Sequence, residues 1–149
     1  MGTQNDISIR SKVADLRILI ADDSEFDRLL ISSCLMRIGF STIQFAENGS
    51  IAMSKLENSI AIGKPFDMVF IDWRMPQHDG QSLVRWIRSQ KAFRKTPLFL
   101  TTAELQPADV QNFHKLGITD FIIKPVSFEV LFRKITEYIV KKSNNNNAA

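Results

Sequence analysis

Residues 70–80, FIDWRMPQHDG, join a run of apolar residues to an acid and then to a turn. The apolar run begins at Phe66 and ends at Asp72, and Pro76 and Gly80 follow soon after the acid. A short apolar run bounded by turn residues is typical of a buried strand. We therefore expect Asp72 to lie at the carboxyl end of a strand, where the chain turns away from the sheet.

Strand-like and helix-like segments alternate on both sides of this stretch. Strands are expected at 16–21, 42–46, 66–72, 98–101 and 120–123, helices at 25–38, 50–57, 81–89, 107–116 and 128–140, and a loop at 58–65. Strands that are apolar along their whole length and alternate with helices predict a parallel sheet covered on both faces. The expected fold is α/β, a doubly wound five-stranded parallel sheet of flavodoxin-like type.

The length and composition fit one soluble domain. The chain has 149 residues, of which 44% are hydrophobic and 23% charged, and its net charge of +3 is too small and dispersed to indicate nucleic-acid binding. It has neither an apolar stretch of the roughly 18 residues that span a membrane nor the apolar core of a signal peptide. With a single cysteine, this composition predicts a cytoplasmic protein with no membrane partner.

Three parts of the chain differ in composition. Residues 1–14 are polar and aperiodic, which predicts a flexible N-terminal arm. Residues 15–142 hold all the alternating segments and form the expected domain. Residues 143–149, SNNNNAA, are of low complexity and are expected to be a disordered tail.

Polar residues end several of the predicted strands. Asp22 and Asp23 follow the first strand, Asp72 ends the third, Thr101 and Thr102 end the fourth, and Lys124 ends the fifth. In an open parallel sheet these positions share one edge, where ligands bind. Crowded carboxylates repel one another unless a cation joins them, and an all-oxygen cluster suits Mg²⁺. A lysine and a hydroxyl opposite that ion provide what a phosphoryl group requires.

Four segments carry a family resemblance, and they are LRILIADDSEFDR, FDMVFIDWRMPQHDG, LFLTTAE and DFIIKPV. They resemble the signature segments of response-regulator receiver domains, the CheY-like signalling domains of two-component phosphorelay systems. The resemblance covers roughly residues 15–140, with the order and spacing of the segments intact. It implies a phosphoprotein that takes a phosphoryl group from a sensor histidine kinase or a histidine phosphotransfer protein.

The resemblance also implies roles for residues at the sheet edge. Asp72 corresponds to the phosphoacceptor, which becomes an aspartyl phosphate. Asp23 and Asp72 would bind Mg²⁺ directly, Asp22 would help mostly through water, and the backbone carbonyl of Arg74 would be a further ligand. Such a domain catalyses only its own phosphorylation and slow autodephosphorylation, so it is not expected to be an enzyme acting on other substrates.

The remaining implied roles belong to the fourth and fifth strands. Thr102, directly before Ala103, corresponds to the switch hydroxyl, and Lys124 would pair with the phosphoryl group. Pro125 belongs to a Lys-Pro bond that is commonly cis in the family.

Phe121 corresponds to an aromatic residue that moves inward when Thr102 moves, although an aromatic on a strand is also an ordinary core residue. The family places its readout on its fourth helix, fifth strand and fifth helix (the α4-β5-α5 surface), here about 107–138. A downstream effector or a second copy of the chain would bind there.

Two charged residues flank the mouth of the expected site. Arg74 and Glu104 occupy positions that tune hydrolysis of the acyl phosphate in receivers, and they suggest a charged pair that partly covers Asp72. The alternative is two independent solvated side chains, because exposed ion pairs contribute only ~0.2–1 kcal/mol.

Three other functions fit parts of the pattern. A haloacid-dehalogenase-type phosphatase needs a second acid two residues after its nucleophile, where this chain has Arg74, which stays protonated. A flavodoxin-like cofactor binder needs a Gly-, Ser- or Thr-rich loop where this chain has Asp22 and Asp23. A pseudo-receiver that acts without phosphorylation is the main alternative, and the complete set of site residues argues against it.

Overall fold

The computed structural model describes residues 4–75 and 79–147. Its helices are α1 (Gln4–Val13), α2 (Glu25–Ile38), α3 (Gly49–Ala61), α4 (Gly80–Ser89), α5 (Pro107–Leu116) and α6 (Phe128–Asn147), with a short 3₁₀ helix at Lys91–Phe93. Its strands are β1 (Arg17–Ala21), β2 (Thr42–Ala46), β3 (Met68–Asp72), β4 (Leu98–Thr102) and β5 (Asp120–Ile123).

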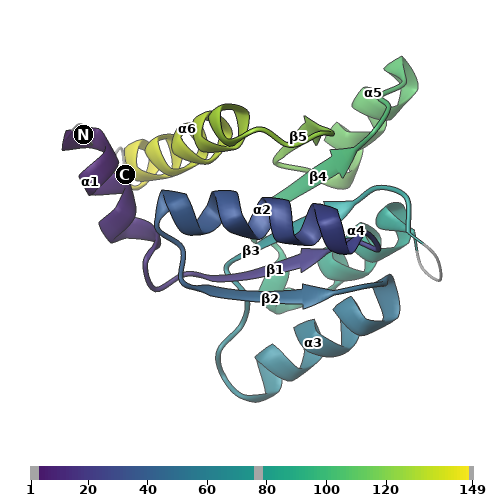
Figure 1. Ribbon diagram of the computed structural model, residues 1–149. Coiled ribbons are helices and arrows are strands. Elements are labelled where there is room, and N and C mark those ends of the chain that lie inside the picture. Colours follow the sequence, from purple (N-terminus) through teal and green to yellow (C-terminus); the bar gives the residue numbers. More distant parts are fainter. Residues whose placement is uncertain (1–3, 76–78, 148–149) are drawn as a thin grey trace.

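The five strands form one parallel sheet in the order β2-β1-β3-β4-β5. Helices cover both faces of the sheet, so the predicted doubly wound α/β fold is confirmed (Figure 1). Because every strand runs the same way, the carboxyl ends of β1, β3, β4 and β5 meet at one edge. The residues after these strands are thereby brought together.

Alternating side chains of the strands divide the core into two clusters. Ile18, Ile20 and Phe70 face α2 and α6, whereas Leu19 and Ile71 face the side covered by α3, α4 and α5. This period of two follows from strand geometry. Both clusters are buried, so the sheet is a rigid platform for whatever its edge carries.

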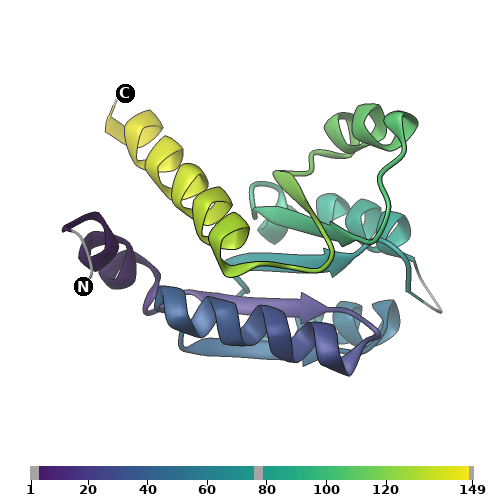
Figure 2. The same ribbon diagram turned by 45° about the horizontal axis from the view of Figure 1, so that its top comes forward.

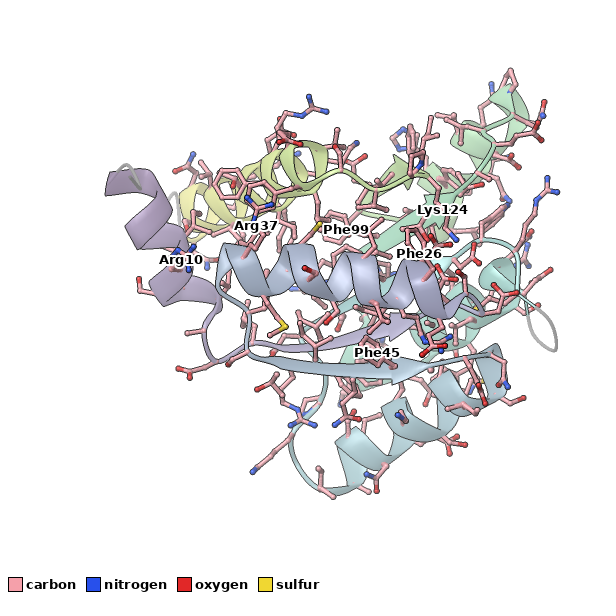
Figure 3. All side chains as sticks on the ribbon, in the orientation of Figure 1. Arg10, Phe26, Arg37, Phe45, Phe99 and Lys124 are labelled. Atoms are coloured by element: carbon pink, nitrogen blue, oxygen red, sulfur yellow. The ribbon has the colours of Figure 1, made fainter. Side chains whose placement is uncertain are left out.

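The N-terminal segment differs from the loose arm expected at residues 1–14. Residues 4–13 form α1, and Ile9 and Val13, one helical turn apart, are buried in the cluster shared by α2 and α6. The Arg10 guanidinium donates to the carbonyl of Arg37 at the end of α2 (Figure 3). In this way α1 docks at the amino-terminal end of the sheet, opposite the edge described below (Figure 2).

The C-terminal segment also differs from its expectation. Helix α6 continues through the asparagine run to Asn147, where the sequence suggests a disordered tail at 143–149. Buried Ile135 and Ile139 anchor the helix, and adding residues to an existing helix costs little. Lys12 of α1 donates to the Ser143 hydroxyl at 3.4 Å. The limits of the domain, 15–142, stay a prediction.

Helix α3 is longer than expected, because residues 58–61 are helical and not part of a loop. Leu56 and Ser59 are buried, and the Ser59 hydroxyl donates to the Leu56 carbonyl at 2.7 Å.

On the other face of the sheet, α2 buries Cys34 beside Leu35 and Ile38. Across residues 4–75 and 79–147, none of the helices has the length and apolar character required to cross a membrane.

Candidate functional site

Asp72 lies at the carboxyl end of β3, as the sequence predicts. All five residues of this strand are buried, and the Asp72 side chain keeps only slight access to solvent. The Trp73 N–H donates to the Thr101 carbonyl at 2.9 Å, and the Arg74 N–H points to Asp72 Oδ1 at 3.3 Å. The carboxylate is therefore fixed by the strand and reached from one side.

Gly80 explains how the chain returns so tightly after Asp72. A Cβ at this position would lie 2.7 Å from the Trp73 Cα and 2.8 Å from the Asp72 carbonyl oxygen. Only glycine allows this approach of α4 to the strand end. Asp79 caps α4 by accepting from the Ser82 N–H at 2.8 Å. In the sequence Gly80 is only a turn signal, and this steric role becomes visible in the structure alone.

Asp22 and Asp23 lie beside Asp72. Asp22 is fully buried, with its Oδ1 accepting from the Ser24 N–H at 2.9 Å, whereas Asp23 is exposed. Each of the three acids offers a carboxylate oxygen, and these oxygens lie within 4.8 Å of one another. The buried Asp22 Oδ2 has one close charged neighbour among the described residues, Lys124 Nζ at 3.0 Å.

Three clustered carboxylates fit a hard divalent cation such as Mg²⁺. A depression of about 410 Å³ opens beside the cluster. The described residues that line it are Asp23, Trp73, Arg74, Met75, Asp79 and Gln81. Asp23 is therefore the acid of the cluster that is reachable from this depression.

Lys124 joins the acids from the end of β5. Its Nζ lies 3.0 Å from Asp22 Oδ2, 3.4 Å from Asp72 Oδ2 and 2.9 Å from Asp27 Oδ2. Figure 3 shows Lys124 at the amino-terminal end of α2, where Phe26 is labelled. In the sequence, Asp27 is an acid in the first turn of the helix expected at 25–38, and this position alone does not predict its contact with Lys124. Its place in the first turn of a helix that begins just after Asp22 and Asp23 is a signal that could have placed it at this edge.

The charges in the cluster shift each other's protonation. Burial raises the pKa of Asp72 to about 7, the negative charge of Asp22 adds to the rise, and Lys124 and the Arg74 N–H oppose it. Burial alone would lower the pKa of Lys124, but hydrogen bonds with Asp27 and Asp22 and the charge of Asp72 raise it above its usual range. The lysine is thus charged at neutral pH, and a cation near Asp72 would stabilise the ionised form of this acid.

Thr102 ends β4 with its hydroxyl turned toward its own loop. Its Oγ1 donates to the Glu104 carbonyl at 2.6 Å, and Ala103 between them is exposed. The neighbouring Thr101 is buried, and its hydroxyl has no hydrogen-bond partner among the described residues. The two threonines therefore differ, and only Thr102 has a hydroxyl engaged at the mouth of the site.

The structure does not contain the Arg74–Glu104 pair that the sequence suggested. Both side chains are exposed, and no ion pair joins them among the described residues. Solvated charges lose little by staying apart, since an exposed pair contributes only ~0.2–1 kcal/mol. The alternative of two independent side chains holds for this structure.

Phe121 and Pro125 occupy positions on either side of Lys124. The Lys124–Pro125 peptide bond is cis, as the resemblance implied. The Phe121 ring is partly buried, 5.9 Å from the Phe113 ring, with Lys134 Nζ 5.1 Å from its centroid. Phe113 in turn meets Trp73 edge to face at 5.1 Å. Aromatic contacts thus connect the residue after Asp72 with the α5–β5 face.

The chain matches known proteins over most of its length. The model of the response regulator receiver domain family matches residues 18–136. Chemotaxis protein CheY1 of Helicobacter pylori is 32% identical over 120 residues, which cover 80% of this chain and 94% of that protein. The Chemotaxis protein CheY homolog of Campylobacter jejuni is 29% identical over 124 residues, which cover 83% of this chain and 92% of that protein.

A solved structure of chemotaxis protein CheY4 from Vibrio cholerae has a TM-score of 0.73 and 28% identity, over 83% of this chain and 98% of that one. Its agreement extends the sequence likeness to the arrangement of the sheet and helices. Together with the four segments at the sheet edge, these matches show that the chain belongs to the family of response regulator receiver domains.

Proposed function

We propose that Asp72 accepts a phosphoryl group from the phosphohistidine of a sensor histidine kinase or a histidine phosphotransfer protein. The observation that carries this proposal is the convergence of Lys124 on Asp22 and Asp72, within 3.0 and 3.4 Å. An ammonium and a cluster of carboxylates at the open edge of a sheet suit a phosphoryl group and a divalent cation.

In the proposed reaction a carboxylate oxygen of Asp72 attacks phosphorus. The phosphorus–nitrogen bond to the imidazole breaks, and the imidazole leaves with its electron pair, so that an acyl phosphate forms on Asp72. Asp23, Asp72 and the Arg74 carbonyl would hold Mg²⁺, with Asp22 helping mostly through water, and the bound ion would supply positive charge to the phosphoryl oxygens. Lys124 would pair with a further phosphoryl oxygen.

Thr102 would then carry the signal away from Asp72. Its hydroxyl now donates to the Glu104 carbonyl, and it must leave that carbonyl to donate to a phosphoryl oxygen. Phe121 would move inward with it and change the surface of α5, β5 and α6 at residues 107–138. A downstream effector or a second copy that binds the changed surface better would shift the population toward it. Ile123 is an exposed apolar residue on this surface.

The direct test is phosphorylation of the purified chain with acetyl phosphate, with and without Mg²⁺, followed by intact-protein mass spectrometry. One added phosphoryl group that requires Mg²⁺ and is lost in Asp72→Asn supports the proposal. Because some receivers accept only from their kinase, a negative result is followed by the phosphoryl mimic beryllofluoride, with Trp73 fluorescence as the signal. No response to either reagent would favour the pseudo-receiver.

A further inference from the structure

Asp27 makes the closest contact with Lys124 of the three carboxylates around it. Its Oδ2 accepts a hydrogen bond from Lys124 Nζ at 2.9 Å, compared with distances of 3.0 Å to Asp22 and 3.4 Å to Asp72. The Lys124 and Asp27 side chains are only 16% and 21% exposed. A charge-assisted hydrogen bond this short and this shielded is stronger than a surface ion pair.

The local backbone holds both partners in place. The Ser24 hydroxyl caps α2 by accepting from the Asp27 N–H at 3.2 Å, and Arg28 donates to the Asp22 carbonyl at 2.7 Å. On the other side, the Lys124 N–H donates to the Thr102 carbonyl at 2.8 Å. The contact between Asp27 and Lys124 is therefore built into the ends of α2 and β5.

A favourable helix dipole is not a sufficient explanation for Asp27. Glu25 lies in the same first turn and would serve the dipole equally well. Glu25 is exposed, and among the described residues it forms no ion pair. A comparison of substitutions at Glu25 and Asp27 therefore separates the effect of charge at the helix end from the effect of contact with Lys124.

We propose that Asp27 is a positioning residue that holds the Lys124 ammonium on the α2 side of the site and competes for it with a phosphoryl group on Asp72. This inference rests on the proposed function. The contact must weaken when Lys124 turns to a phosphoryl oxygen, so Asp27 lowers the affinity of the site for that group. It also takes part of the ammonium's hydrogen bonding from Asp22 and Asp72, and so favours cation binding by these two acids.

The contact therefore has opposite effects on two ligands. Without the Asp27 carboxylate, Lys124 can turn to the phosphoryl group at a lower cost. When no phosphoryl group is bound, however, its ammonium pairs more strongly with Asp22 and Asp72. We expect Asp27→Asn to bind beryllofluoride about fivefold more tightly at saturating Mg²⁺, from the lower end of ordinary coupling energies. We expect Asp27→Asn to bind Mg²⁺ alone about threefold more weakly, since the Lys124 ammonium then competes more strongly with the cation for Asp22 and Asp72.

The titrations use Trp73 fluorescence in a Trp86→Phe background, which leaves one of the two tryptophans. Glu25→Gln is the matched control, because it removes one charge from the same helical turn, and it should change either affinity less than about twofold. Asp27→Glu keeps a carboxylate within reach of Lys124 and should restore the original values. Asp27→Ser removes the carboxylate with a different side chain and should repeat the result of Asp27→Asn.

The inference is overturned if both variants without the carboxylate match Glu25→Gln, or if they weaken beryllofluoride and Mg²⁺ together. The second pattern would mean that Asp27 only maintains the shape of the site. If the unsubstituted protein binds Mg²⁺ but not beryllofluoride, the proposed function itself fails, and the inference fails with it. These results are distinguishable because the unsubstituted protein and the variants are titrated side by side.

Discussion

Asp72→Asn should raise the free energy of unfolding of the metal-free protein above pH 7. The Asp72 side chain is 8% exposed, and its pKa is raised from 3.8 to about 7, first by burial and then by the charge of Asp22. An acid with a raised pKa binds more protons when folded than when unfolded. Stability therefore falls as pH rises from about 4 to about 7 and then levels off.

The size of the effect follows from the shift. About three pKa units at ~1.36 kcal/mol each give an upper limit of ~4 kcal/mol above pH 7. Water entry and relaxation of the side chain reduce this, so we expect a gain of about 2 kcal/mol for the amide at pH 8. The gain should shrink steadily toward pH 5, because the acid of the unsubstituted protein becomes protonated.

Urea unfolding in the presence of a chelator, at pH 5, 6, 7 and 8, measures this directly. Asp15→Asn is the matched control, since Asp15 is exposed, and it should change stability by less than ~0.5 kcal/mol at every pH. A loss of stability at pH 8, or a gain of equal size at pH 5 and pH 8, would refute the reasoning. Adding Mg²⁺ should favour the unsubstituted protein, because its carboxylate can bind the cation.

Three further substitutions test separate contacts. Gly80→Ala should cost about 2–3 kcal/mol of stability in urea unfolding, because the new Cβ would meet backbone atoms at 2.7–2.9 Å. In the comparison variant Gly63→Ala the Cβ meets open space, but φ is +72°, and the cost should be about 1 kcal/mol. Equal costs for the two variants would contradict the steric account. Thr101→Val removes a buried hydroxyl that has no described partner, so thermal unfolding should show no loss and up to ~1 kcal/mol of gain. Lys124→Gln should destabilise the metal-free protein by about 3 kcal/mol, because it leaves the carboxylates around Lys124 without their cation. Mg²⁺ should restore much of this stability by taking the place of the ammonium charge, and failure to restore it would contradict this reasoning.

The polar residues at the sheet edge could be predicted from sequence, because each of them directly follows or ends an apolar run along the chain. An apolar run followed by Asp72 or by Lys124 gives both a strand and its end, and parallel order then brings the ends together. The confirmed features are the five strands, their parallel arrangement in one sheet and the clustering of Asp22, Asp23 and Asp72. The chemical roles of these residues stay predictions.

The features that sequence did not reveal depend on contacts between distant elements. Ile9 and Val13 make α1 stable only by packing against α2 and α6, and the polar residues around them hide this. The separate charges of Arg74 and Glu104 and the approach of Asp27 to Lys124 depend on side-chain directions at the edge, which spacing alone does not fix. Tertiary contacts decided each of these outcomes.

The burial of Cys34 in α2 has a practical consequence. Burial raises the pKa of this thiol above its usual value, and the side chain is almost inaccessible. Maleimide reagents react with exposed thiolates, so the single native cysteine should stay unlabelled under mild conditions. A probe attached to a cysteine placed at exposed Ile123 would then report on the α5–β5–α6 face alone, without any change to the native core.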